Sequence, residues 1–126
     1  MIGQWTMAAL VAGMVVAAAA GAGERSFTIA NIDYEGSKAF VPSTIIDRKG
    51  DTVKIKLLNN IPGDPNQHGF AIPDFGVEAV VTRGEPKEVE LVADREGLFP
   101  IKCHLHPAHL GGQLLVLPEE TGKPSE

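Results

Sequence analysis

The seven-residue segment "CHLHPAH", from Cys103 to His109, holds three of the four histidines and the only cysteine of the chain. The fourth histidine, His68, lies earlier, in "NQHGFAI". A thiolate and several imidazoles form a soft to borderline ligand set, which suits copper or zinc far better than magnesium or calcium. The residue types therefore predict a transition-metal site, and by themselves they leave copper and zinc both open.

The side-chain phase of "LFPIKCH" indicates which of these residues face the interior. Phe99, Ile101 and Cys103 share one parity, whereas Lys102 and His104 share the other. Side chains alternate across a strand, and Lys102 is expected to face water, so Cys103 is predicted to point inward. By the same phase His104 begins on the wet side, and we interpret it as a rim residue rather than a ligand.

The remaining histidines are placed where turns can direct them to the sulfur. His106 and His109 follow Cys103 by three and six residues, past a proline that breaks the strand. His68 follows a Pro/Gly/Asn-rich loop at 60–67 and begins a predicted strand. Two distant segments would then grip one ion, and the predicted metal ligands are His68, Cys103, His106 and His109.

A single cysteine excludes an internal disulfide, and an exposed free thiol is a liability in an oxidising compartment. A metal-bound thiolate accounts for Cys103, and the alternative is a buried, inert thiol. A Cys-His hydrolase is disfavoured because no third orienting group or oxyanion signature is evident. We assign no catalytic residue.

The segments around these residues alternate with period two. Val53, Ile55 and Leu57 stand on one side of a predicted strand, and Lys54 and Lys56 stand on the other. About seven or eight such short strands follow one another, with turn signals every ten or so residues. No long amphipathic helix appears in this part of the sequence. The pattern predicts an all-β, antiparallel sandwich or barrel.

An apolar run without charged residues, "MAALVAGMVVAAAAGAG", precedes these strands. We predict a signal peptide or membrane anchor at 1–23, with cleavage near 20–23 favoured, a domain at 24–118 and a polar tail at 119–126. The protein is then periplasmic or exported, and it contacts a membrane only if the leader is uncleaved. The net charge of −5 disfavours nucleic acid as a partner, and a homo-oligomer is compatible with the sequence.

At "VPSTIIDRKGDTVKIKLLNN" and "CHLHP" the sequence resembles the cupredoxins, small copper proteins with a Greek-key sandwich. The likeness covers about 26–118. The run "HGFAIPDFGV" also resembles the dinuclear copper domains of cytochrome oxidase subunit II and nitrous oxide reductase. Those domains have a second cysteine four residues after the first. Pro107 stands at that position here, so the resemblance implies a mononuclear centre.

Within that family the sequence is most similar to the nitrosocyanins, red mononuclear copper proteins, in "GFAIPDFGV" and "ADREGLF". The resemblance places Cys103, His106 and His109 on ligand positions. It departs at His68, where a nitrosocyanin has glutamate. The usual cupredoxin axial methionine is also absent, because Met1, Met7 and Met14 all lie in the leader. His109 in that place implies a more tetragonal site with a weaker blue colour and a lower reduction potential.

The function expected from the resemblance is one-electron transfer by one copper ion, cycling between Cu(I) and Cu(II), to or from a redox partner protein. Two alternatives remain open. One is redox catalysis at copper on a small nitrogen or oxygen species, as the nitrosocyanin likeness suggests. The other is copper delivery or storage. Zinc at the same ligands is the alternative cofactor. An electron carrier, rather than an enzyme, is the favoured interpretation.

Overall fold

The computed structural model describes residue 3 and residues 23–120, and this part of the chain contains nine strands and one short 3₁₀ turn. They are β1 Glu24–Tyr34, β2 Ser37–Val41, β3 Thr44–Arg48, β4 Thr52–Asn59, β5 Gln67–Ile72, η1 Pro73–Phe75, β6 Val77–Thr82, β7 Lys87–Val92, β8 Gly97–Ile101 and β9 Gly112–Leu117. The all-β prediction is confirmed, with one or two strands more than expected. Among the described residues, no helix has the length and hydropathy needed to cross a bilayer. The predicted leader, apart from residues 3 and 23, and the predicted tail beyond residue 120 lie outside them.

The strands form a four-stranded sheet in the order β2-β1-β4-β7, a three-stranded sheet in the order β3-β9-β8, and the hairpin β5-β6. The pairs β1–β4 and β3–β9 are parallel, so the expectation of an antiparallel sandwich or barrel is wrong for these two pairs and holds for the others. The reason lies at Pro42-Ser43, where the chain passes from β2 in one sheet to β3 in the other without a hairpin turn. Between β1 and β4 it reverses only twice, at Glu35-Gly36 and Lys49-Gly50.

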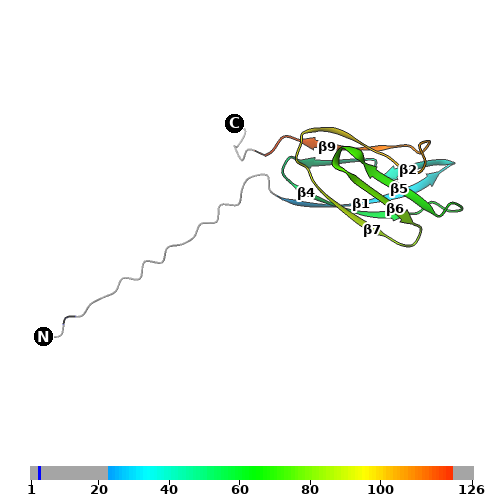
Figure 1. Cartoon of the computed structure of the whole chain (residues 1–126), viewed down its shortest axis with the longest axis horizontal. Coiled ribbons are helices and arrows are strands. Elements are labelled where there is room, and N and C mark those ends of the chain that lie inside the picture. Colours follow the sequence, from blue (N-terminus) through cyan, green and yellow to red (C-terminus); the bar gives the residue numbers. More distant parts are fainter. Residues whose placement is uncertain (1–2, 4–22, 121–126) are drawn as a thin grey trace.

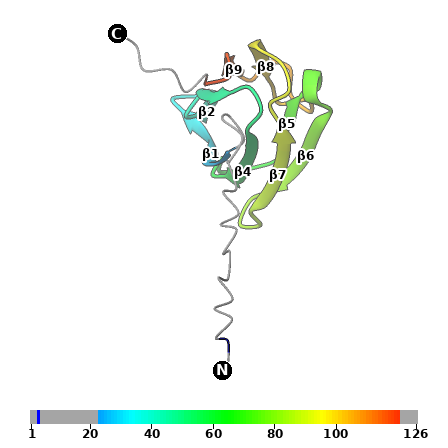
Figure 2. The ribbon, with the colours of Figure 1, turned by 90° about the vertical axis from the view of Figure 1, so that its left-hand side faces the viewer.

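Figure 2 shows the strands arranged around a common interior, with β8 and β9 on one side and β1, β4 and β7 on another. The β5-β6 hairpin closes the gap near β8. Ala71 and Lys102 join it to the segment after β8 through two backbone hydrogen bonds of 2.8 and 2.9 Å. The connection from β8 to β9 lies at the end of the sandwich opposite the point where β1 begins (Figure 1). The two ends can therefore be considered separately.

The predicted alternation of β4 is confirmed in the core. Val53, Ile55 and Leu57 are buried, while Lys54 and Lys56 face outward, opposite glutamates of β7 in the strand register. Opposite charges across a strand pair add a modest stabilisation to the larger effect of apolar burial. The buried cluster continues through both layers with Ile29, Phe40, Ile45, Phe70, Ile72, Leu91, Ile101, Leu114 and Val116. This core fixes the strands that carry the predicted ligands.

Candidate metal centre

Cys103 lies two residues beyond the end of β8 and keeps the inward phase of that strand. Ile101 and Cys103 are each 2% exposed, whereas Lys102 between them faces solvent. The backbone of Lys102 is held by its two hydrogen bonds to Ala71 of β5. The predicted inward orientation of Cys103 is therefore confirmed, and its sulfur lies against the strand that carries His68.

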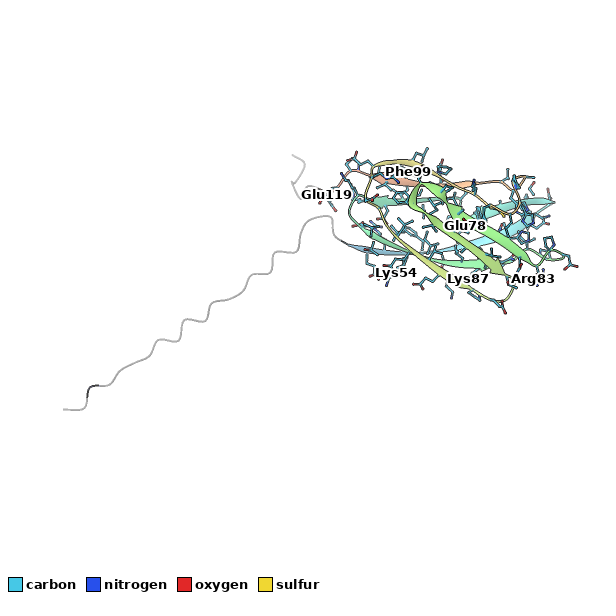
Figure 3. All side chains as sticks on the ribbon, viewed as in Figure 1. Lys54, Glu78, Arg83, Lys87, Phe99 and Glu119 are labelled. Carbon is cyan, nitrogen blue, oxygen red and sulfur yellow. The ribbon has the colours of Figure 1, made fainter. Side chains whose placement is uncertain are left out.

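His68 is the second residue of β5, and only 3% of its surface is exposed. Neither of its ring nitrogens has a hydrogen-bond partner. The loop before β5 is fastened by Arg83, labelled in Figure 3, whose guanidinium donates to the carbonyls of Ile61 and Gly63 at 2.9 and 2.7 Å. A buried imidazole without a partner is costly in an apolar core, which points to a ligand for one of its nitrogens.

The loop after Cys103 winds through two successive turns. The amide of His106 donates to the carbonyl of Cys103 at 3.2 Å, and the amide of His109 donates to the carbonyl of His106 at 3.0 Å. These turns bring both imidazoles back over His68. The ring centroid of His68 lies 4.8 Å from that of His106 and 5.1 Å from that of His109. The two loop rings are stacked, with centroids 4.7 Å apart.

The four predicted ligands come together at this end of the sandwich, which we call the ligand end. One potential donor atom from each of them lies within 4.8 Å of all the others. The Sγ of Cys103 is 3.5 Å from Nδ1 of His106. Metal–ligand bonds of about 2 Å allow one ion to reach donors at such separations. The unpartnered nitrogens of His68, together with the soft donor set, fit a copper or zinc ion.

The electrostatic setting favours neutral imidazoles. Burial, followed by the charge of His106, lowers the pKa of His68 below its ordinary value. The pKa of His109 is lowered by the same two causes in the same order, and then by His68. An imidazole binds a metal ion through an unprotonated nitrogen. Burial therefore favours, at His68 and His109, the unprotonated form that coordinates a metal.

Gly69 belongs to this site, although the sequence analysis did not single it out. Its amide donates a hydrogen bond of 3.2 Å to the sulfur of Cys103. A Cβ atom at position 69 would lie 2.5 Å from Nδ1 of His104, so only glycine fits without a shift. A glycine inside a strand is a signal of close approach, and "HG" at the start of β5 offered that signal.

His104 is not one of the four clustered residues. Its side chain is only 15% exposed, so the expectation that it lies on the wet side is wrong. Its Nε2 lies 3.1 Å from a carboxylate oxygen of Glu78, which Figure 3 labels on β6. Its Nδ1 is buried and has no hydrogen-bond partner. His104 therefore covers the backbone of Gly69 and connects the ligand loop to the β5-β6 hairpin, without offering a donor to the cluster.

The sandwich and its buried cysteine–histidine cluster define a metal-binding protein of the cupredoxin type. The chain belongs to the cupredoxin-like domain family, whose model matches residues 6–116. Over 65 residues, half of this chain, it is 38% identical to nitrous-oxide reductase of Cupriavidus necator and 35% identical to that of Ralstonia nicotianae. These matches span only 10% of each reductase.

Solved copper proteins share the fold. Copper nitrite reductase of Nitrosomonas europaea has a TM-score of 0.63 at 19% identity, covering 81% of this chain and 45% of that one. Auracyanin of Roseiflexus castenholzii has a TM-score of 0.59 at 14% identity, covering 74% and 97%. The metal-binding domain of a Cu(I)-exporting ATPase of Streptococcus pneumoniae has a TM-score of 0.61 at 16% identity, covering 75% and 87%. The cupredoxin prediction is confirmed, and the closer likeness to nitrosocyanins stays a prediction.

Proposed function

We propose that this protein is an exported, mononuclear copper protein that transfers single electrons, with His68, Cys103, His106 and His109 as the copper ligands. The convergence of their donor atoms within 4.8 Å of one another carries the proposal. Copper bound there would supply the Cu(I)/Cu(II) couple. The proposal agrees with the family of the chain and with its likeness to copper proteins.

A rigid site favours electron transfer over other roles. His68 is buried on β5 and Cys103 is buried just beyond the end of β8, and the amide of Gly69 donates to the sulfur. Ligands that the fold holds in place move little when the charge of the ion changes. A hydrogen bond to the cysteine sulfur tunes the reduction potential of the bound copper. The residues of this chain would thus hold the geometry, exclude water and stabilise the thiolate.

The loop that carries His106 and His109 also offers a surface for a partner. Leu105 and Leu110 are 43% and 58% exposed and flank the two half-buried ligands. Exposed aliphatic side chains beside a metal site suit docking to a redox protein. Transient electron-transfer complexes bury little surface, so a patch of this small size is sufficient. The ligand loop is therefore the face on which we place electron entry and exit.

One observation supports a second candidate function. A cavity of about 150 Å³ adjoins the cluster and is lined by Lys102, Cys103, His104, Pro107 and His109. Such an opening admits a small molecule, which suits redox catalysis on a nitrogen or oxygen species. Titration of the copper-loaded protein with azide distinguishes the two functions: an unchanged EPR spectrum supports the closed electron carrier, and a shifted spectrum supports an open, catalytic site.

Absorption and EPR spectra of the copper-loaded protein test the proposal directly, with His109→Met as the comparison. We expect a weak blue band and a tetragonal EPR signal in the native protein, because an imidazole binds Cu(II) more tightly than a distant thioether. The variant should turn strongly blue. An intense blue native spectrum would remove His109 as a tight ligand. Spectra without a copper signal in both proteins would favour zinc.

A further inference from the structure

Two buried carboxylates lie at the end of the sandwich opposite the ligands, which we call the carboxylate end. Asp47 is the fourth residue of β3 and is 1% exposed, and Asp51 precedes β4 and is 7% exposed. One oxygen of Asp47 accepts the amide of Arg48 at 2.8 Å, and the other has no partner. Burial of carboxylates without matching positive charge is expensive, so this arrangement calls for a cation.

Arg25 is the cation near these two carboxylates, and it does not balance both of their charges. Arg25, on β1, reaches Asp47 only with an Nε–Oδ1 distance of 3.8 Å, and its side chain is 56% exposed. The interaction with a half-exposed guanidinium is screened by solvent and contributes little. Burial, followed by contact with Asp51, raises the pKa of Asp47 to about 6. One negative charge at this end thus lacks a partner in the described part of the chain.

The backbone nitrogen of Gly23 contacts one of these two carboxylates, that of Asp51. Its amide donates to Oδ1 of Asp51 at 2.9 Å, and its carbonyl accepts the amide of Thr52 at 2.8 Å. Gly23 is thus fixed on both sides, and it is the residue immediately before β1. In the sequence it directly follows "AGA" at 20–22, the small-x-small pattern after which leader sequences are removed.

We propose that the chain is cleaved between Ala22 and Gly23, and that the new α-ammonium group of Gly23 forms an ion pair with the carboxylate of Asp51, next to Asp47. Hydrolysis of the Ala22–Gly23 peptide bond by a leader peptidase consumes one water and leaves a carboxylate on Ala22 and an amine on Gly23. That amine is protonated at neutral pH. An ion pair then replaces an amide–carboxylate hydrogen bond at the same atom, because the donor gains a full positive charge while the acceptor keeps its negative one.

This inference rests on the export that we propose above, but it is independent of copper. Processing would act as a folding step: removal of the leader supplies the charge that the carboxylate end lacks. The precursor should consequently be less stable than the processed protein. Both forms can be compared without metal, so a failure here is distinguishable from a failure of the proposed electron-transfer function.

The first measurement is the intact mass of the protein isolated after export of the full precursor. A mass that corresponds to a chain beginning at Gly23, with a free amine, is expected. A retained leader, or cleavage at any other bond, would overturn the proposal.

The second measurement compares Asp51→Asn in two metal-free forms, the exported protein and the full precursor kept in the cytoplasm. Urea unfolding should show that the substitution increases the unfolding equilibrium constant about ten-fold more in the exported form. Asp94→Asn, which changes an exposed carboxylate paired with Arg95, is the matched control and should act equally on both forms. Equal effects of Asp51→Asn on both forms would refute the ion pair.

A third variant keeps the test decisive if Asp51→Asn does not fold. One alanine inserted between Ala22 and Gly23 leaves the domain unchanged and moves the new ammonium group by about 3.8 Å, the length of one residue. If that inserted alanine remains on the processed chain, the chain should lose the stability gained by processing. Retention of the full gain would show that the charge of the ammonium group is irrelevant.

Discussion

The two ends of this sandwich both collect buried polar atoms, but they resolve the cost of burial differently. At the ligand end, His68 and Cys103 are buried donors of soft to borderline character. At the carboxylate end, Asp47 and Asp51 are hard, acidic and close to an arginine. Donors of the first kind call for a transition-metal ion, whereas carboxylates of the second kind call for a proton or an ammonium group.

The difference teaches how one small core supports two unlike sites. Strand β4 begins directly after Asp51, and its last residue, Asn59, donates to the carbonyl of Val81, the partner of His68 in the strand register. The hydrophobic core, which includes Ile55 and Leu114, lies between the two ends. Changes at one end should leave the other unaffected, because sites farther apart than about 10 Å without shared partners act additively. The following predictions test this separation, in order of decreasing effect.

Replacement of the sulfur should have the largest effect. Cys103→Ser removes the thiolate while keeping the size of the side chain, and copper affinity should fall by more than about 100-fold, beyond the usual cost of losing a supporting group. The visible charge-transfer absorption should disappear. Copper content per chain and absorption spectra measure both effects. The free energy of unfolding of the metal-free variant in urea should keep the pH dependence set by Asp47. A changed pH dependence would show that the two ends are coupled.

Gly69→Ala should destabilise the ligand end without removing any ligand. The added methyl group would lie 2.5 Å from Nδ1 of His104, and overpacking of this kind costs about 1–3 kcal/mol. Urea unfolding of the metal-free protein measures the loss. The double variant Gly69→Ala, His104→Ala opens the space and should recover most of it. No recovery would mean that the contact with His104 is not the cause.

The carboxylate end predicts a pH dependence with a definite sign. The pKa of Asp47 is raised from 3.8 to about 6, chiefly by burial, so the folded state holds this proton more tightly than the unfolded chain does. Its contribution to stability is complete below pH 3.8 and is lost as the pH rises through about 6. Thermal unfolding of the metal-free precursor should show this decline, and Asp47→Asn should flatten it. A processed chain with an ammonium group at Gly23 should show a weaker decline.

His104→Gln should have the smallest effect. The side chain contacts Glu78 at the rim rather than the cluster, so copper content and EPR parameters should stay unchanged. Loss of one exposed contact should change the free energy of unfolding by about 1 kcal/mol or less. An altered copper spectrum would show that His104 shares the ligand role, and Lys102→Gln serves as the neighbouring control.

The sequence alone determined the all-β class, most of the strand segments and the ligand types. Alternation in "VKIKL" and "LFPIKC" is a local signal, since each residue reports its own side of a strand, and it correctly turned Cys103 inward. It failed at His104, which lies past the end of β8 and has a side chain that is only 15% exposed. Strand β2 escaped notice because Ser37–Val41 is short and follows a turn in which a non-glycine residue, Glu35, has a positive φ of 49°.

Only the tertiary structure decided which distant segments meet. The parallel pairing of β1 with β4, the hydrogen bond from Gly69 to the sulfur, and the approach of Asp47, Asp51 and Gly23 all depend on strand register. Between strands that no tight turn connects, such as β1 and β4, no turn geometry sets the register, so the sequence contains no local signal for which residues meet. The sequence therefore identifies the candidate donors by residue type, while the tertiary packing of the strands determines which ion or charge each set of donors can bind.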